Sequence, residues 1–367
     1  MTTVMLAAGG TGGHVIPALT VARLLKARRP AWTCVAVSGQ RGMPERLWDA
    51  SVVTLETVPT QPWPRGLELV DVRYWWRQGV SAVRIARLLK RHRPGVVVGF
   101  GGYVAGPTVM LAKLLGIPTV IHEQNVFPGR TTRLLVRWAD RVAVSFEETR
   151  RHLPSRAAVT VTGNPVRPEV EGHTRAAAAK SFELSPSQPI LLITGGSQGS
   201  HCLNEVSVEA LARLTPAQRR MFQVIHLTGP HDGSWVTERY RSLGITARVH
   251  PFLSTMGPAY AAATLVVARA GATTVAELVA TATPSVLVPY PHAGAHQAVN
   301  AQWLARHAGA LVLDQAVFTP ERFLDVIVPL LTDPERLQAM RAALSRLATP
   351  GAAERMADTV AEVAHAA

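Results

Sequence analysis

Cysteine is nearly absent from this chain of 367 residues, which contains only Cys34 and Cys202. Two cysteines without a Cys-x-x-Cys spacing exclude a disulfide framework and a zinc knuckle, and they fit a reducing compartment. Long apolar runs are missing too. The most apolar region, residues 260–290, is interrupted by Arg269 and Glu277, so we expect no transmembrane helix. No basic segment precedes the first apolar run, so no signal peptide is predicted.

Acidic residues are scarce in one part of the chain only. Residues 1–165 hold 22 Lys and Arg against 9 Asp and Glu, and the remaining residues hold 16 of each, so the whole net charge of +13 lies in the first part. This asymmetry predicts an anionic partner, either nucleic acid or an acidic lipid surface. A generally Arg-rich proteome is the alternative, but it explains the asymmetry poorly.

Short β-type runs alternate with helical stretches, which predicts an α/β protein with parallel sheets covered on both faces. The length suggests two domains. The predicted strands are Val4–Ala8, Cys34–Ser38, Val96–Phe100, Thr119–His122, Arg141–Ser145, Val159–Thr162, Ile190–Thr194, Phe222–Leu227, Thr246–Val249, Leu265–Ala268 and Ser285–Pro289. The predicted helical stretches include Leu19–Arg28, Val80–Arg91, Thr108–Leu115 and, at the end, Glu335–Ala366.

The turn-rich segment Gly163–Pro168 separates the two halves. Residues that precede proline avoid the helical conformation, so we interpret this segment as a linker. The first predicted domain is residues 1–165, with a C-terminal helix of about residues 345–367 packing back on it. The second is residues 166–344.

Two glycine-rich turns directly follow predicted strands. Residues 9–13 are Gly-Gly-Thr-Gly-Gly, and residues 195–199 are Gly-Gly-Ser-Gln-Gly. A strand, a glycine turn and a helix form the opening unit of nucleotide-binding domains, where backbone N–H groups face an anion. The repeat predicts two doubly wound, Rossmann-like domains that face a cleft.

The first turn lacks the companions of two common nucleotide sites. The strand Cys34–Ser38 ends without the acid that holds an NAD ribose, and no Gly-Lys-Ser/Thr follows the turn, which disfavours an NAD oxidoreductase and a P-loop NTPase. His14 follows instead. At a helix start beside a cleft this imidazole is either a general base or a residue without chemical function.

Other strands also end in polar segments. Glu123 and Asn125 follow a strand of the first half, where they either orient sugar hydroxyls or are solvated loop residues. Ala272–Thr274 begin a helix of the second half and suit a diphosphate, and Glu277 lies about a turn further on, where a carboxylate suits a ribose.

A last polar cluster begins another helix. His296 and Gln297 lie three to four residues before Asn300, so they share a helix face and suit the hydroxyls of a hexose. No carboxylate pair and no Asp-x-Asp motif accompanies them, so we expect a site without a metal ion.

Seven motifs in this order resemble the MurG family of GT-B glycosyltransferases, over about residues 4–309. They are Gly-Gly-Thr-Gly-Gly-His (9–14), Gly-Gly-Tyr (101–103), His-Glu-Gln-Asn (122–125), Gly-Asn-Pro-Val-Arg (163–167), Gly-Gly-Ser-Gln-Gly (195–199), Arg-x-Gly-Ala-x-Thr (269–274) and His-Gln-x-x-Asn-Ala (296–301). The resemblance implies a GT-B fold. It also implies inverting transfer of N-acetylglucosamine from UDP-N-acetylglucosamine to the C4 hydroxyl of the muramyl sugar of lipid I, giving lipid II for peptidoglycan synthesis.

The resemblance also implies the site residues. The catalytic residues would be His14, as candidate base, and Glu123. The donor site would contain Thr11, Gly12, Gly13, Asn125, Arg167, Ser197, Phe252, Leu253, Ala272, Thr273, Thr274, Glu277, His296, Gln297 and Asn300. The acceptor site would contain Gly10, Thr11, Tyr103 and Glu123. Neither a metal nor another cofactor is implied.

Lipid I is anchored in the inner leaflet, so the resemblance implies a peripheral protein on the cytoplasmic face of the membrane. Residues 74–76 are Tyr-Trp-Trp, and apolar residues at helical spacing follow them among many arginines. This pattern is typical of an interfacial helix that binds an anionic surface, with Trp138 nearby. A core helix with a solvated basic face is the alternative.

The sequence departs from the family pattern at Pro44, Thr132, Thr264, Ala282 and Gly294. These changes leave open a drifted enzyme or a GT-B relative, either a transferase with another acceptor or a UDP-sugar 2-epimerase. A nucleic-acid-binding protein would explain the basic half but neither Glu277 nor the cluster at residues 296–300, so we expect no nucleic acid partner. The oligomeric state is not predicted.

Overall fold

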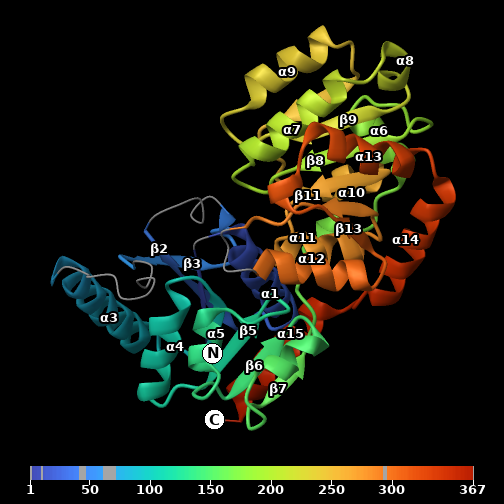
Figure 1. Ribbon diagram of the computed structural model, residues 1–367. Coiled ribbons are helices and arrows are strands. Elements are labelled where there is room, and N and C mark those ends of the chain that lie inside the picture. Colours follow the sequence, from blue (N-terminus) through green and yellow to red (C-terminus); the bar gives the residue numbers. More distant parts are fainter. Residues whose placement is uncertain (1, 10, 41–46, 61–71, 292–295, 367) are drawn as a thin grey trace. The chain divides into compact units, whose positions relative to one another are not determined.

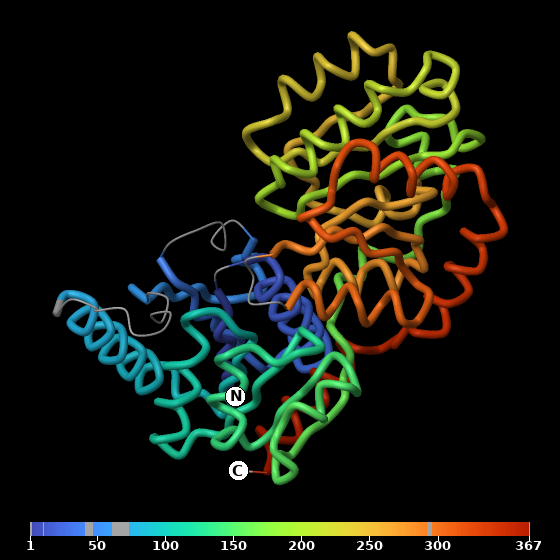
Figure 2. The backbone as a smooth tube through the Cα atoms, in the orientation of Figure 1, coloured from blue at the N-terminus to red at the C-terminus, as the bar shows by residue number. Residues whose placement is uncertain are grey.

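A computed structural model describes residues 2–9, 11–40, 47–60, 72–291 and 296–366. The chain forms two compact units, Met1–Arg167 with Gly351–Ala367, and Pro168–Pro350 (Figures 1 and 2). The boundaries predicted from the sequence, at residue 165 and at about residue 345, lie slightly earlier in the chain.

The described part of the first unit contains a seven-stranded parallel sheet with the order β3-β2-β1-β4-β5-β6-β7. Its strands are β1 (Thr3–Ala8), β2 (Thr33–Gly39), β3 (Thr54–Val58), β4 (Val96–Gly101), β5 (Thr119–Glu123), β6 (Arg141–Val144) and β7 (Val159–Val161). Its helices are α1 (Gly12–Arg28), α3 (Val72–His92), α4 (Ala105–Leu114), α5 (Arg130–Leu135), the 3-10 helix η1 (Glu147–His152) and, from the end of the chain, α15 (Ala352–His365).

Helices cover both faces of this sheet. Along β1, Val4 and Leu6 point into a core shared with α1 and α15, whereas Met5 points into a second core shared with α3, α4 and α5. Because both faces are buried, the strands are continuous apolar runs rather than alternating ones.

The described part of the second unit contains a six-stranded parallel sheet with the order β10-β9-β8-β11-β12-β13. Its strands are β8 (Ile190–Thr194), β9 (Gln223–Leu227), β10 (Ala247–His250), β11 (Leu265–Ala268), β12 (Ser285–Leu287) and β13 (Ala310–Val312). Its helices are η2 (Pro168–Val170), α6 (Arg175–Ser181), α7 (His201–Ala212), α8 (Pro216–Arg219), α9 (Gly233–Ser242), α10 (Gly257–Ala262), α11 (Ala272–Ala280), α12 (His296–Arg306), η3 (Gln315–Val317), α13 (Pro320–Leu331) and α14 (Pro334–Leu347).

The predicted parallel α/β architecture is confirmed, and the C-terminal helical stretch is divided by a break whose position was not predicted. The helical stretch expected over Glu335–Ala366 is two helices, because α14 ends at Leu347 and α15 begins at Ala352. Pro350 cannot continue the helix, and Gly351 takes a φ of +77°, a left-handed conformation that glycine adopts without strain. The break lets α15, red in Figure 1, return to the first unit and pack beside α1.

Strand order reverses once in each sheet. In the first unit the reversal lies between β1 and β4, and in the second it lies between β8 and β11. Loops that leave the carboxyl ends of such neighbouring strands diverge, and ligands of open α/β sheets bind in the resulting crevice. Both glycine turns lie at these reversal points, so the loops there are the candidate functional loops of each unit.

Candidate active site

His14 lies in the first turn of α1, with its imidazole held by the glycine turn that precedes it. Its Nδ1 lies 3.0 Å from the carbonyl oxygen of Gly9. A carbonyl oxygen only accepts, so Nδ1 carries the proton and Nε2 of the neutral ring carries a lone pair. Burial lowers the pKa of His14, against smaller opposing effects of the Gly9 hydrogen bond and of Glu123. The ring is therefore neutral at pH 7 and chemically able to accept a proton.

Two glycines at the end of β4 make room for this arrangement. Gly101 has a φ of +102°, and a Cβ there would lie 2.9 Å from His14 Nε2. Gly102 has a φ of +77°, and a Cβ there would lie 2.2 Å from the carbonyl oxygen of Gly9. The loops after β1 and β4 thus pack at a distance that no larger residue permits.

Glu123, at the end of β5, is buried and holds its own loop together. Its Oε1 accepts hydrogen bonds from the backbone N–H and the side-chain amide of Asn125, at 2.9 and 3.0 Å. Its Oε2 accepts from the N–H of Gly129 at 2.8 Å and from the hydroxyl of Thr132. Four hydrogen bonds use the acceptor capacity of a carboxylate. Sequence reasoning placed Glu123 among the catalytic residues, whereas these contacts make it the anchor of residues 123–132.

His122 is a buried residue that sequence reasoning did not single out. Its Nε2 donates to the carbonyl oxygen of Gly163, at 3.1 Å, and its Nδ1 accepts from Gln124 at 3.1 Å. Gln124 also donates to the carbonyl oxygen of Phe100 at 2.7 Å. Burial lowers the pKa of His122 to about 4, so the ring is neutral. Its hydrogen bonds tie the ends of β4 and β5 to the start of the segment after β7.

The second glycine turn, between β8 and α7, also depends on close backbone approach. Gly199 and Gly229 have φ values of +72° and +81°. A Cβ on Gly199 would lie 2.3 Å from the carbonyl oxygen of Thr228. Ser200 then caps α7 by accepting a hydrogen bond from the N–H of Leu203. The N-terminus of α7 is the helix end that this turn presents.

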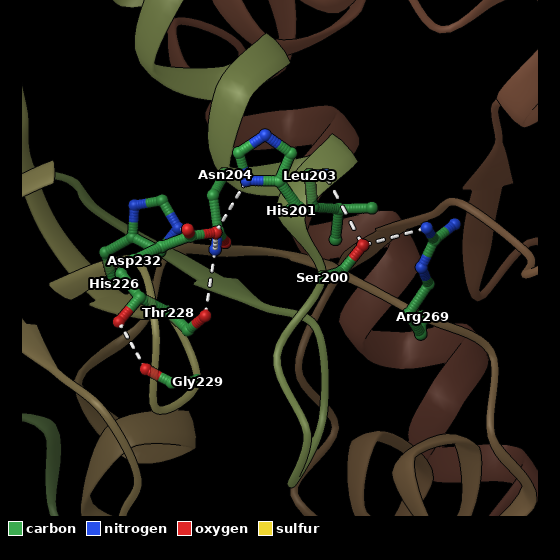
Figure 3. A network of polar contacts seen from close by, with 9 residues as sticks. All are labelled: Ser200, His201, Leu203, Asn204, His226, Thr228, Gly229, Asp232 and Arg269. Atoms are coloured by element: carbon green, nitrogen blue, oxygen red, sulfur yellow. Dashed lines mark hydrogen bonds and ion pairs between the residues drawn. The ribbon is translucent and has the colours of Figure 1, made fainter. Parts of the chain in front are cut away.

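Arg269, directly after β11, joins three loops at the reversal point. Its Nη2 donates to the hydroxyl of Ser200 at 2.8 Å, as Figure 3 shows. Its Nη1 donates to the carbonyl oxygens of Val288 and Pro289, at 3.0 and 3.4 Å, and its guanidinium lies over the ring of Tyr290. Sequence reasoning quoted Arg269 only as part of a motif and gave it no role.

Arg269 is a buried cation, with only 7% of its surface exposed. Burial lowers its pKa, but a guanidinium keeps its proton. Within the described residues no salt bridge links Arg269 to a carboxylate, so no side-chain anion there neutralises its charge. The positive charge of Arg269 therefore lies between the loops that follow β8 and β11.

A polar network behind the second turn holds the β9–α9 loop. Asn204 donates from its amide to the carbonyl oxygen of Thr228 at 2.8 Å and to Asp232 at 2.7 Å (Figure 3). Asp232 also accepts from His201 at 3.0 Å, and Asn204 accepts from the buried His226 at 3.0 Å. These contacts fix the loop against which Gly199 packs.

Glu277, in the second turn of α11, is 4% exposed. Its Oε2 accepts a hydrogen bond from the hydroxyl of Tyr260, at 3.0 Å. Ahead of it, Ala272, Thr273 and Thr274 form the first turn of α11, as the sequence predicted. The N–H groups of such a first turn have no partner within their helix, so they are donors for an anion.

Two residues predicted to contact the sugar, Gln297 and Asn300, also form hydrogen bonds to loop backbone. Gln297 Oε1 accepts from the N–H groups of Ala270 and Tyr290, at 3.2 and 2.9 Å. The fully buried Asn300 donates to the carbonyl oxygen of Ala270 at 3.2 Å. Both side chains of α12 thus support the loop after β11.

The other predicted site residues differ in exposure. Thr11, Tyr103 and Phe252 are exposed, and Ser197 and Leu253 are half-buried. The half-exposed Arg167 ends the first unit, and Gly12 and Gly13 begin α1. The half-buried His296 begins α12. Gly10, Pro44 and Gly294 lie outside the described residues. Among the described side chains, no group of three or more His, Cys, Asp and Glu is arranged to hold a metal ion.

Comparison with known proteins identifies the family. The N-terminal domain of glycosyltransferase family 28 matches residues 4–144, and the C-terminal domain of the same family matches residues 190–356. The chain belongs to glycosyltransferase family 28. The two matched segments contain both reversal points, so the candidate site consists of family 28 loops.

Members of family 28 resemble the chain over nearly its full length. A Syntrophotalea carbinolica protein, named UDP-N-acetylglucosamine--N-acetylmuramyl-(pentapeptide) pyrophosphoryl-undecaprenol N-acetylglucosamine transferase, is 40% identical over 366 residues that cover 96% of each chain. A Moorella thermoacetica protein with the same name is 38% identical over 365 residues, again 96% of each chain. The crystal structure of Acinetobacter baumannii MurG matches 99% of this chain and all of its own, with a TM-score of 0.77 at 30% identity. The resemblance to MurG is confirmed.

Three departures from the family 28 pattern have a visible structural role. The Thr132 hydroxyl donates to Glu123. Thr264 accepts a hydrogen bond from the N–H of Ile190, at 3.0 Å, and so pins the start of β8 to the start of β11. Ala282 follows α11 with a φ of +48°, a conformation that favours glycine. Thr132 and Thr264 thus each form a hydrogen bond within the fold, whereas Ala282 has a strained backbone conformation.

Proposed function

We propose that the chain is an inverting glycosyltransferase that moves N-acetylglucosamine from UDP-N-acetylglucosamine to the C4 hydroxyl of the muramyl sugar of lipid I. The product is lipid II, the lipid-linked disaccharide of peptidoglycan synthesis. The proposal rests on one observation above all: relatives at 38–40% identity over 96% of the chain carry the name of this transferase. The loops at the two reversal points suit the chemistry.

The acceptor side is the first unit. We assign the general base to His14, whose Nε2 carries a lone pair and whose lowered pKa keeps it unprotonated near neutrality. His14 would take the proton of the C4 hydroxyl as the oxygen bonds to the anomeric carbon. Thr11, the exposed cap of α1, and the adjoining glycine turn suit the acceptor diphosphate, and the exposed Tyr103 suits its sugar.

The donor side is the second unit. The first turn of α11, the turn at Ser197 and the buried charge of Arg269 favour the diphosphate of UDP, and they stabilise it as it leaves with the bonding electron pair. Arg167 is a further cation for this role. Glu277 suits the ribose hydroxyls, and Phe252 with Leu253 suits the uracil. Attack from the face opposite the leaving UDP turns an α-linked donor into a β-glycoside.

Glu123, Gln297 and Asn300 receive supporting roles in this proposal. The hydrogen bonds of Glu123 hold Asn125 at the rim of the sheet, from where the Asn125 amide can reach a substrate sugar. Gln297 and Asn300 hold the loop that begins α11. His296, at the start of α12, remains a candidate contact for the donor sugar.

We also propose that α3 binds the membrane that carries lipid I. Trp75 and Trp76 are 57% and 74% exposed, and Val80 and Val83 are exposed as well. The basic residues on the same helix are Arg73, Arg77, Arg84, Arg87, Lys90 and Arg91. Aromatic and apolar side chains among cations are the composition of an interfacial helix. Within the described ranges, none of the helices has the length and apolarity needed to span a bilayer.

The C-terminal half of α3 carries buried apolar residues. Ile85, Leu88 and Leu89 are buried against β-strands and α4. The C-terminal turns of α3 thus contribute to the core, and the exposed N-terminal turns support the proposed membrane contact.

The test is release of UDP from UDP-N-acetylglucosamine with and without a short-chain lipid I analogue. Acceptor-dependent release with a β-linked disaccharide product supports the proposal. Conversion of the donor without acceptor would instead indicate a 2-epimerase, an activity named for a Listeria monocytogenes protein whose fold matches with a TM-score of 0.70 at 12% identity. Donor binding without transfer to lipid I would point to a different acceptor.

A further inference from the structure

Tyr260 is a buried tyrosine whose hydroxyl bonds to Glu277, a residue of the proposed donor site. It lies in the short helix α10 and is 2% exposed. Its hydroxyl donates to Oε2 of Glu277 at 3.0 Å, and Glu277 is 4% exposed. The contact joins two segments that are 17 residues apart in sequence and that lie on different helices.

The hydrogen bond restricts how the Glu277 carboxylate can point. The backbone of α11 fixes only the Cα of Glu277, and a glutamate side chain has three further torsions. A buried carboxylate needs hydrogen-bond donors, and a bond to a charged group is stronger than a neutral one. One phenolic donor occupies one of about four acceptor sites of a carboxylate, so this hydrogen bond restricts the orientation of the carboxylate plane. Ribose hydroxyls are donors of the kind that a carboxylate accepts.

The place of α10 in the chain links this contact to the rest of the proposed donor site. The helix directly follows the segment of Phe252 and Leu253, for which we propose contact with uracil. Its first residue, Gly257, lies so close to the chain that a Cβ there would be 2.2 Å from the carbonyl oxygen of Glu169. This close approach places the start of α10 against η2, which restricts the position of the helix that carries Tyr260.

We propose that Tyr260 is a positioning residue that orients Glu277 toward the ribose and thereby sets the preference for a ribonucleotide over a 2′-deoxyribonucleotide donor. The inference rests on the proposed function, because it takes Glu277 as the ribose contact. It adds to that function the origin of the sugar selectivity in the nucleotide.

The test compares the binding of UDP and of 2′-deoxy-UDP by calorimetry in the full chain and in Tyr260→Phe. We expect the unmodified chain to prefer UDP by about tenfold or more, which is the range for one hydrogen bond to a charged group. In Tyr260→Phe we expect UDP to bind more weakly and the preference to fall by about threefold to tenfold. In turnover, the KM for the donor should rise while kcat changes little.

Tyr240→Phe is the matched control. Tyr240 is also buried in the second unit, and its hydroxyl bonds to a side chain, Nδ1 of His226, at 2.8 Å. Loss of the Tyr240 hydroxyl should leave the ratio of the affinities for UDP and 2′-deoxy-UDP unchanged. Because the ratio compares two ligands on one sample, a purely structural weakening does not move it.

A double-mutant cycle completes the design. If Tyr260 acts through Glu277, Tyr260→Phe should change the ratio little once Glu277→Ala is present. An unchanged ratio in Tyr260→Phe, or equal effects with and without Glu277, would overturn the inference. If the unmodified chain binds no UDP at all, the proposed function itself fails, which is a distinct result.

Discussion

The two units share one architecture but hold their loops by different means. In the first unit, the loops after β1 and β4 meet through glycines, and the side chain enclosed between them is the imidazole of His14. In the second, the loops after β8 and β11 are bridged by the guanidinium of Arg269. The first arrangement leaves a neutral base at the reversal point, and the second leaves a positive charge. The same topology thus places a neutral imidazole at the reversal point of one unit and a guanidinium at that of the other.

The units also differ in what they expose. The first has Trp75 and Trp76 on a basic helix, whereas the exposed tryptophan of the second, Trp235, is 37% exposed and stacks edge-on with His201. The net charge follows the same division. The most exposed tryptophans and the net positive charge both lie in the first unit, which is why we propose that this unit contacts the membrane.

The largest expected effect is on the base. His14→Ala should lower kcat for transfer by about 100-fold or more, since general bases contribute that much, while UDP affinity stays the same. UDP release with the lipid I analogue measures the first and calorimetry the second. His231→Ala, an exposed histidine of the second unit, is the control.

The acid limb of the rate profile provides a second readout for the same variant. A general base acts only in its unprotonated form, and the pKa of His14 is lowered from 6.5. We therefore expect kcat/KM to decrease toward acid, with the midpoint of the decrease at a pH below 6.5. Near-normal turnover in His14→Ala would mean that another group accepts the proton of the acceptor hydroxyl. The proposed role of the first unit as the source of the base would then be wrong.

The next effect tests the surface difference. Trp75→Ala with Trp76→Ala should weaken sedimentation with vesicles of anionic phospholipid by at least about tenfold, because each large apolar side chain contributes about 1.5–3 kcal/mol on burial. Trp235→Ala should leave sedimentation unchanged. Equal losses in both variants would argue against α3 as the contact.

The described residues include a fully buried, neutral histidine in each unit, His122 in the first and His226 in the second, which predicts that both units are sensitive to acid. Burial lowers the pKa of His122 to about 4 and that of His226 to about 3, whereas an unfolded histidine titrates near 6.5. Between about pH 6.5 and 4 the unfolded chain binds more protons, so the free energy of unfolding should fall as pH falls, by about 1.4 kcal/mol per pH unit for each histidine.

Calorimetric unfolding between pH 7.5 and 4.5 measures this slope. His122→Gln should reduce the pH dependence of the free energy of unfolding for the first unit alone. His226→Gln should do the same for the second unit alone. A variant that leaves its slope unchanged would show that the histidine is protonated in the folded chain.

The smallest expected effect concerns helix ends. In the first unit, α4 is followed by Gly116 at a φ of +73°, whereas in the second α11 is followed by Ala282 at +48°. Ala282→Gly should raise the free energy of unfolding by about 0.5–1 kcal/mol, because relief of left-handed strain exceeds the added entropy of the unfolded chain. Thermal unfolding checks this, and Gly116→Ala should produce the opposite sign.

Much of the fold followed from local patterns. Buried parallel strands are apolar runs, so most were predicted, but β3 was missed because Thr54–Val58 is half polar, and β13 because it has only three residues. The stretch Glu335–Ala366 was predicted to be helical from its alanine-rich pattern, but the break at Pro350 and Gly351 was not predicted. Local propensity is weak where a single break decides the path of the chain.

The sequence by itself determined the two glycine turns and the family, and it supplied the residues that we propose for the site. These depend on local conformation, since only glycine permits the close approach at Gly102 and Gly199. Tertiary structure alone decided what each polar side chain does. Glu123 became a loop anchor, Arg269 a bridge between loops and Tyr260 a partner of Glu277, because a buried polar group must bond to whatever the fold brings within 3 Å, and that neighbour comes from distant sequence.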